Sequence, residues 1–299
     1  MATGTTTTGD LIIPEVWADA VAPTILGKAV LLPLVDADDQ LVGQPGETVI
    51  FPKFDYIGDA ATLTEGVAMD TTKLTMTDAR ATIVEVGQAV ELTDSATLAA
   101  IGNPNSQAQT QLALSVARKI DADIRTAAER IVTGSSDPLN PNTTPLVLTK
   151  ADLPLSWNRL VDGFALLGDE YAPSEIAGIV VHSKQHAQLL KDANFISADK
   201  FGPGAVIQRG QVGTIGTIPV FISDRATAVA DVDPGAGTVA GFNALIIRKG
   251  AVALKYKRRP IVETDRDILK RTNIITTNVH YAVKRIDDRG VVVVPTNAA

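Results

Sequence analysis

The chain has 299 residues, 45% hydrophobic and 20% charged, which is the composition of a folded protein with a large core rather than of a disordered chain. It has no cysteine, which excludes disulfides, thiolate catalysis and sulfur-ligated metal sites. The net charge of −7 argues against strong DNA binding, since proteins that neutralise phosphates usually present a basic face.

The N-terminal region predicts neither a signal peptide nor a long helix. Residues 2–9 are mainly Thr and Gly, without the basic and apolar parts of a signal sequence, and no apolar run in the chain approaches the ~20 residues of a membrane span, so we expect a soluble chain. Residues 11–35 are apolar but interrupted by three prolines and a glycine. Such an arm cannot fold on itself, so we expect it to lie against another subunit, with Trp17 among its contacts.

Residues 43–93 alternate apolar and polar residues and are rich in Thr and Val, which is typical of strands. Two strands, 48–54 and 82–92, are predicted to flank a polar excursion of about two dozen residues, far longer than the two to five of a usual hairpin loop. We expect 48–54 and 82–92 to be able to close through a short turn, and the excursion to dock on a neighbouring subunit. Its candidate contact residues are Tyr56, Leu63, Met69, Leu74 and Met76.

Two helices should follow. The first is expected to start at Thr93 or Asp94 and to stop at Gly102. The second, over 104–133, has Asn103 as its cap and a proline in its first turn. Its apolar positions recur every three or four residues and predict one buried face. These positions are Leu112, Val116, Ile120, Ile124, Ala128 and Ile131.

The middle of the chain has an α/β pattern, and the remainder is rich in strands. Ser156 and Ser183 are predicted to cap two helices on either side of a short buried strand. The glycines of 210–225 are spaced G-x-x-G-x-x-G and lead into a strand, so they indicate a turn rather than a dinucleotide-binding loop. Turns are predicted at Lys249-Gly250 and Arg289-Gly290.

No motif predicts catalysis, a cofactor or a metal. His182 and His186 are four residues apart but lack the glutamate of the H-E-x-x-H pattern. Pairs of aspartates, including Asp121 and Asp123, are expected to meet Lys, Arg or solvent, and there is no P-loop or G-x-S-x-G sequence.

One stretch, 255–271, is strongly basic and has two interpretations. It can be a nucleic-acid patch centred on Lys257, Arg258 and Arg259, or a solvated or subunit-facing strand whose charges pair with a neighbour. The second is favoured because acidic residues are interleaved and Tyr256 is the only aromatic residue.

The order of these segments resembles the major capsid protein of tailed bacteriophages, with the fold named after phage HK-ninety-seven. The resemblance covers nearly the whole chain. It is carried by "DLIIPEVWADAV", "LVGQPGETVIFPKF", "ARKIDADIRTAAERI", "GIVVHSKQHAQLLKD", "GTIGTIPVFISDR" and the run from "ALKYKRRPIVETDRDILK" to "RIDDRGVVVV". None of these is a catalytic motif; what is specific is their order.

The resemblance implies an α+β fold with five parts. These are an N-terminal arm (1–42), an extended loop (43–93), a peripheral domain with a long spine helix (94–155), an α/β axial domain (156–254), and strands that complete the peripheral domain (255–299).

The resemblance also implies a structural shell subunit without a cofactor. Its expected partners are copies of itself in pentamers and hexamers, a separate scaffolding protein, a portal, cement proteins, and double-stranded DNA that is enclosed with weak contact; no membrane is involved. We expect it in the host cytoplasm before assembly and in the virion capsid afterwards. Two alternatives stay open: an encapsulin-type nanocompartment shell, and an α/β enzyme with a small-molecule site near 202–216.

Overall fold

The computed structural model describes most of the chain. The described residues are 5–6, 29–39, 41–42, 45–54, 57–58, 60, 62, 66, 68–69, 71–131, 144–148, 153–168, 172–192, 211–215, 218–224, 228–229 and 241–297.

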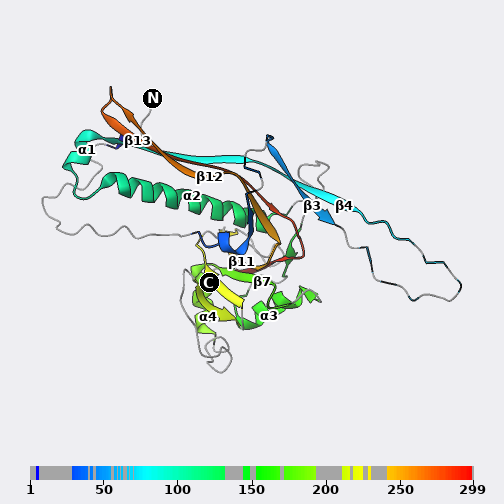
Figure 1. The fold of residues 1–299 in the computed structure, drawn as a ribbon. Helices are drawn as coiled ribbons and strands as arrows, with labels where there is room; N and C mark the ends of the chain where they lie inside the picture. The colour runs from blue at the N-terminus through cyan, green and yellow to red at the C-terminus, as the bar shows by residue number, and fades with distance from the viewer. Residues whose placement is uncertain are drawn as a thin grey trace.

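A five-stranded sheet forms the elongated part of the molecule (Figure 1). Its central strands are β5 (Val84–Thr93), β13 (Thr272–Arg285) and β12 (Val252–Asp267), which pair antiparallel, β5 with β13 and β13 with β12. Two short parallel strands, β1 (Thr5–Thr6) and β2 (Asp36–Asp38), complete its edges. A 3-10 turn, η2 (Leu32–Leu34), precedes β2.

The long helix α2 (Pro104–Glu129) packs along this sheet (Figure 1). The Asn103 side chain accepts a hydrogen bond from Ser106 N–H, as predicted for its cap, and the stripe from Leu112 to Ala128 is buried. The predicted end at residue 133 is wrong. Arg130 leaves helical geometry, and Ile131 lies beyond the helix with 57% of its surface exposed, outside the four cores of the described residues.

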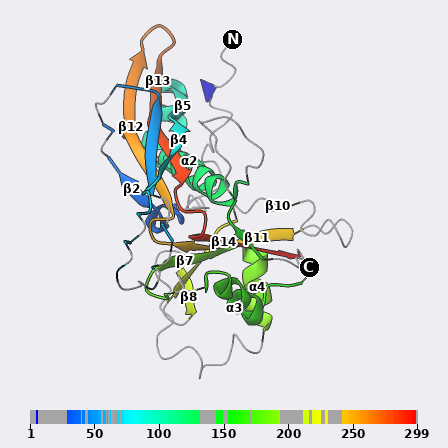
Figure 2. The ribbon, with the colours of Figure 1, turned by 90° about the vertical axis from the view of Figure 1, so that its right-hand side faces the viewer.

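A seven-stranded sheet forms the compact part of the molecule. Its main order is β6-β14-β11-β7-β9-β8, and β10 pairs with β11. The strands are β6 (Leu146–Val147), β7 (Ile176–Val181), β8 (Gln211–Ile215), β9 (Ile218–Ile222), β10 (Ala228–Val229), β11 (Gly241–Arg248) and β14 (Val291–Asn297). Helices α3 (Trp157–Ala165) and α4 (Ser183–Lys191) lie beside this sheet (Figure 2).

Successive residues of this sheet belong to two different cores. Leu245 and Val293 pack in the core that contains Ile124 of α2, whereas Ile246 and Val294 pack in the core that contains Leu160 of α3. Since side chains alternate between the faces of a strand, the sheet is covered on both faces, which explains why β11 and β14 are nearly continuous apolar runs.

A separate two-stranded hairpin extends away from the rest of the molecule (Figure 1). It pairs β3 (Thr48–Phe54) with β4 (Met76–Thr82), from Thr48 opposite Thr82 to Phe54 opposite Met76. The expectation that 82–92 lies opposite 48–54 is therefore wrong, because the end of the excursion itself forms β4. The next strand, β5, pairs with β13, and Leu92 of β5 shares a hydrophobic core with Ile275 of β13.

Local capping explains the remaining helix boundaries. Thr93 caps α1 (Asp94–Ala99) through Ala96 N–H, and Ser156 caps α3, both as predicted. The predicted cap Ser183 is wrong: His182 is the cap of α4, its ring accepts from Lys184 N–H, and the Gln185 side chain accepts from His182 N–H. The stretch 210–225 contains a second strand, β8, that pairs with β9 in a hairpin.

Candidate functional site

The described part of the extended hairpin exposes large apolar side chains, as the docking hypothesis requires. Met69 is 70% exposed, and Leu74 and Met76 are similarly open to solvent. None of the three contributes to any of the four hydrophobic cores formed by the described residues. The other predicted contacts, Trp17, Tyr56 and Leu63, lie outside the described residues.

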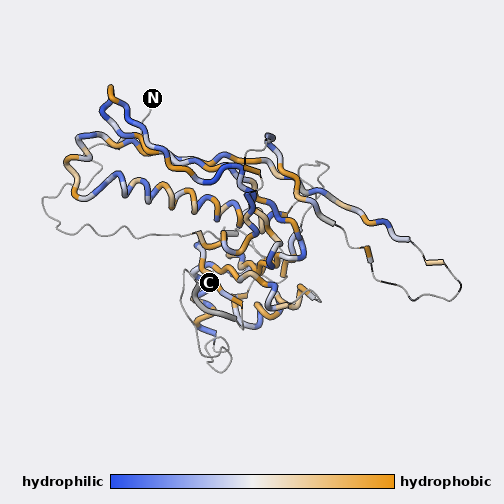
Figure 3. Tube along the Cα trace, viewed as in Figure 1, coloured by the Kyte–Doolittle hydropathy of each residue, from blue (hydrophilic) through white to orange (hydrophobic). Residues whose placement is uncertain are grey.

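A second exposed apolar group lies at the far end of the elongated sheet, and the sequence reasoning missed it. Ile268 and Leu269, the latter 95% exposed, form the tip of the β12–β13 hairpin, which is orange in Figure 3. Leu98 of α1 is also exposed, and an ion pair of 2.8 Å between Arg266 and Asp94 joins the hairpin to α1. The adjacent apolar pair Ile268-Leu269 inside the charged run 255–271 was the available signal.

The predicted basic residues of β12 are engaged within the chain. Lys257 donates to the carbonyl of Gly46, and Arg258 forms an ion pair of 3.0 Å with Glu263. Arg259 Nε donates to Asp39 at 2.9 Å, and this hydrogen bond lowers the pKa of the Asp39 carboxyl. All three side chains stay near the surface, and the charges of Arg258 and Arg259 are partly neutralised by acidic residues of the same chain.

The rest of the basic run follows the same pattern. Lys255 lies 3.9 Å from Asp38, and Lys270 lies 3.8 Å from both Glu91 and Asp267. Exposed pairs of this kind contribute little stability, but they reduce the positive potential that would attract phosphates. The geometry favours the solvated-strand interpretation of this run.

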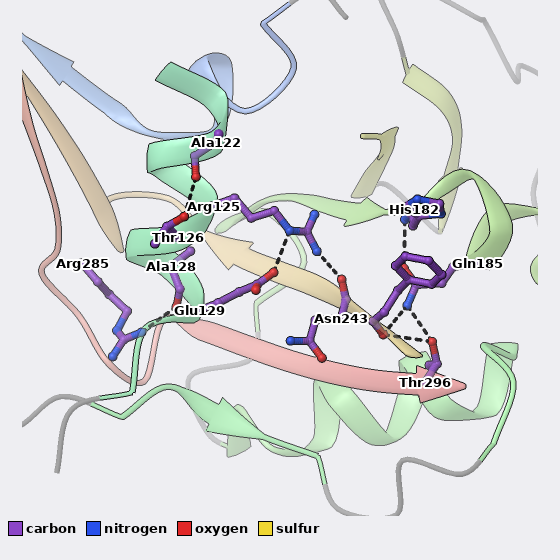
Figure 4. A network of polar contacts seen from close by, with 11 residues as sticks. Ala122, Arg125, Thr126, Ala128, Glu129, His182, Gln185, Asn243, Arg285 and Thr296 are labelled. Carbon is purple, nitrogen blue, oxygen red and sulfur yellow. Dashed lines mark hydrogen bonds and ion pairs between the residues drawn. The ribbon is translucent and has the colours of Figure 1, made fainter. Parts of the chain in front are cut away.

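A buried ion pair lies within the C-terminal end of α2, and its arginine also links the helix to the seven-stranded sheet (Figure 4). Arg125, 1% exposed, lies 2.7 Å from Glu129 and also donates to the Asn243 carbonyl of β11. Burial lowers the pKa of Arg125 and raises that of Glu129, and the attraction between the two charges opposes both shifts. Removing one member would leave the other charge buried without its partner.

A neutral network holds α4 against the same sheet (Figure 4). The Gln185 side chain donates to Phe242 O at 2.9 Å and to Thr296 Oγ1 at 2.6 Å, and accepts from His182 N–H. The His182 ring stacks on Phe242 at 3.9 Å, and burial lowers the pKa of His182. In this arrangement His182 is a helix cap with a packed, neutral ring.

Asp121 has a role that the sequence reasoning missed. The sequence analysis placed it with Lys, Arg or solvent, but it is buried and accepts from Val30 N–H at 2.6 Å and from Leu31 N–H at 3.1 Å. Asp121 therefore holds the backbone at Val30 and Leu31, directly before η2. The residues next to Asp121 in the sequence do not indicate this contact.

Within the described residues, there is no group of three or more His, Asp or Glu side chains arranged to hold a metal ion. No helix among them is both long and apolar enough to cross a membrane. The polar contacts described above hold helices and strands against one another. The β3–β4 and β12–β13 hairpins expose large apolar side chains to solvent.

Comparison with known proteins identifies the family. The model of the phage capsid protein family matches residues 76–294. The chain is 28% identical to the major capsid protein of Staphylococcus phage phiMR11 over 290 residues, covering 96% of this chain and 94% of that protein.

Solved capsid structures share the fold. That of cyanophage Pam1 superposes with a TM-score of 0.71 at 17% identity, covering 100% of both chains. The capsid of Ralstonia phage GP4 gives 0.70 at 15% identity, covering 100% of this chain and 99% of that one. Mycobacterium phage Che8 gives 0.67 at 18% identity, over 94% and 96%.

These matches run through both sheets and α2, and they agree with the phage interpretation rather than with the encapsulin or enzyme alternatives. The chain belongs to the phage capsid protein family, as a structural subunit of a phage capsid.

Proposed function

We propose that this subunit forms rings of five and six that close into an icosahedral shell around a double-stranded DNA genome. A single type of subunit encloses a volume economically by repeating the same contacts in symmetric rings. In this proposal its role is mechanical containment, and it carries out no catalysis.

The observation that carries the proposal is the projecting β3–β4 hairpin. Its base is anchored by the buried side chains of Val49 and Phe51, which pack with Ala253 and Ala282. Beyond that base, Met69, Leu74 and Met76 are open to solvent. Apolar surface held away from its own core is stabilised when another subunit covers it, at roughly 25 cal/mol per Å².

The predicted segments take their roles from this arrangement. Residues 1–42 would be the arm, 43–93 the extended loop over a neighbour, 94–155 the peripheral domain with its spine helix, 156–254 the axial domain, and 255–299 the closing strands. Trp17, Tyr56, Leu63, Met69, Leu74 and Met76 would make inter-subunit contacts, together with Lys257, Arg258 and Arg259.

Assembly would occur in the host cytoplasm, with a separate scaffolding protein and a portal, and cement proteins could bind the finished shell. The DNA would be enclosed with weak contact, because the net charge is −7 and the basic run is partly neutralised by its own chain.

Sedimentation and electron microscopy of the purified protein, with and without co-expressed scaffolding protein, test the proposal. The expected result is rings of five and six and closed shells of uniform diameter. Monomers and dimers alone, even with the scaffolding protein present, would contradict it.

A further inference from the structure

A cavity of about 520 Å³ lies between the C-terminal half of α2 and strands β4, β5 and β13. Five of its charged lining residues are basic and one is acidic. They are Arg80, Lys119, Arg130, Lys284, Arg285 and Asp123. Among the lining residues alone this is an excess of four positive charges, in a chain whose net charge is −7, so the cavity is a place where a negative ligand would be attracted.

The acidic groups near the cavity are already in use. Asp123 lies 2.6 Å from Lys119 and also accepts from the Tyr281 hydroxyl at 2.6 Å. Asp78, next to the cavity, binds Arg80 at 2.6 Å. In the part of the chain that the structure describes, neither Arg130 nor Lys284 has an acidic group within ion-pair distance.

Arg285 is the buried element of the cavity wall. It is 3% exposed, donates to Ala128 O at 2.6 Å and binds Asp288 at 2.8 Å. Its second terminal nitrogen, Nη2, is buried and has no hydrogen-bond partner among the described residues. A buried donor without an acceptor is costly, and this one belongs to a wall whose lining holds more cations than carboxylates.

Lys284, next to Arg285, is also surrounded by more positive than negative charge. Burial lowers the pKa of Lys284, and the positive charges of Arg130 and Arg285 lower it further, against the opposing effect of Asp288. The groups facing Lys284 from α2, β13 and the following turn are thus mainly cations.

We propose that this cavity binds carboxylate side chains of a second copy of the chain, supplied by its acidic segment 55–75. The inference rests on the proposed shell function and adds the electrostatic partner of the extended loop. Residues 55–75 contain Asp55, Asp59, Glu65, Asp70 and Lys73 as their charged residues, which gives 1 − 4 = −3.

Geometry favours a second copy over the same chain. Arg80 lies on β4, and that strand starts at Met76, at the end of the hairpin from which 55–75 departs. The four residue steps from Met76 to Arg80 span about 13 Å of extended strand. The hairpin is directed away from the body (Figure 1), so its paired end at Phe54 and Met76, from which the acidic segment departs, points away from the rest of the subunit.

A volume of about 520 Å³ accommodates a few side chains. It is a poor match for a DNA duplex, which presents its phosphates along a broad convex surface, so DNA is the competing outcome rather than the proposed ligand.

Peptide binding to the unassembled subunit tests the cavity independently of shell formation. The probe is a fluorescent peptide of residues 55–75, and its control has Asn or Gln in place of its four acidic residues. We expect Lys284→Glu to weaken binding of the acidic peptide at least tenfold, and the control peptide to bind both proteins equally weakly. Lys191→Glu, an equal charge change at an exposed position on α4, should leave binding unchanged.

The melting temperature separates binding from folding. Lys284→Glu removes repulsion from Arg130 and Arg285, so it should melt at the same temperature as the unchanged protein or higher. Absence of binding to the unchanged subunit, or equal binding by Lys284→Glu, would overturn the inference and leave the shell proposal intact.

A charge swap tests the same contact in assembly. Lys284→Glu and the double change Asp59→Lys with Asp70→Lys should each lower the assembled fraction at least tenfold at low salt, and their combination should restore most of it. If the combined variant did not restore assembly, the acidic segment would not be the ligand. If the variants instead formed normal shells with reduced DNA content, the cavity would bind phosphates rather than the acidic segment.

Discussion

Asp121 and Arg125 lie on the buried side of α2 among aliphatic residues, and each is held by specific partners rather than by solvent. Asp121 binds the two backbone N–H groups that precede η2, while Arg125 bridges Glu129 and β11. At the residue scale, the long helix is therefore a packing stripe with two polar anchors, one toward the N-terminal segment and one toward the compact sheet.

Replacing Asp121 by Ala should destabilise the subunit by about 2–3 kcal/mol, because two backbone donors lose a charged acceptor. Denaturant unfolding measures this loss. Asp162→Ala, at an exposed position on α3, is the control and should change stability by less than about 0.5 kcal/mol. Equal effects of the two changes would show that Asp121 does not anchor the segment.

The titration of Asp121 gives a pH-dependent prediction. Burial raises the pKa of its carboxyl, and the N–H groups of Val30 and Leu31 oppose this shift. Because the folded chain then binds this proton more tightly than the unfolded chain, the pH-dependent part of the contribution of Asp121 is complete below its ordinary pKa and is lost as pH rises through its folded pKa, while the hydrogen bonds from Val30 and Leu31 remain. The stability difference between the unchanged protein and Asp121→Asn should fall as pH rises above about 4. If this stability difference rose with pH, the pKa of Asp121 would be lowered rather than raised by folding.

Ile124 tests the buried stripe of α2. Its side chain is fully buried between the two sheets, so Ile124→Asp would bury an unpaired charge at a cost of several kcal/mol and should give insoluble protein. Gln111→Asp, on the exposed face of the same helix, should stay soluble. Soluble and fully assembling Ile124→Asp would show that this face is misassigned.

At the element scale, the β3–β4 hairpin combines an anchored base with an open end. Val49 and Phe51 fix the base on β12 and β13, and no described residue between Phe54 and Met76 belongs to any of the four cores of the described residues. The element can therefore lose its end without losing the contacts that hold it to the subunit.

Replacing residues 57–74 by a Gly-rich turn should leave helix content and melting temperature near normal while abolishing or strongly weakening assembly. The replacement keeps β3 and β4 paired, because their register ends at Phe54 and Met76. Each apolar side chain removed would cost the assembled state roughly 1.5–3 kcal/mol if it is buried there. Circular dichroism and sedimentation measure the two effects. Stable particles of the original size would show that the loop is not the clamp between subunits.

At the scale of the whole molecule, the chain crosses repeatedly between the five-stranded and the seven-stranded sheets. β11 and β12 follow one another but lie in different sheets, and β13 and β14 do the same. With α2 packed between them, the elongated and compact parts share one core, so they are expected to unfold together.

Weak DNA binding is the corresponding prediction for the whole surface. The free subunit should show negligible affinity for duplex DNA near physiological salt, because of its net charge of −7 and the pairing of Arg258 and Arg259 with acidic groups. Titration of a labelled duplex measures this. A sub-micromolar, steeply salt-dependent affinity that is lost in the triple change of Lys257, Arg258 and Arg259 to Ala would make the basic run a binding patch.

Local features of the fold were predictable from the sequence because neighbouring residues determine them. The caps Thr93, Asn103 and Ser156 accept from N–H groups three residues ahead, and the apolar period of α2 follows from 3.6 residues per turn. The exposure of Met69 and Leu74 likewise follows from a segment too poor in apolar residues to form a core. The order of such segments also carried the family resemblance.

Only the tertiary structure decided which distant segments meet. Alternation along 48–54 and 82–92 predicts strands but not partners, since any two strands of suitable pattern can pair, and the choice of β13 for β5 depends on the shared core. The same holds for Asp121 with Val30 and for the cations of α2 and β13 around one cavity. Those contacts join residues 90 or more positions apart, and a local pattern does not record what lies across the core.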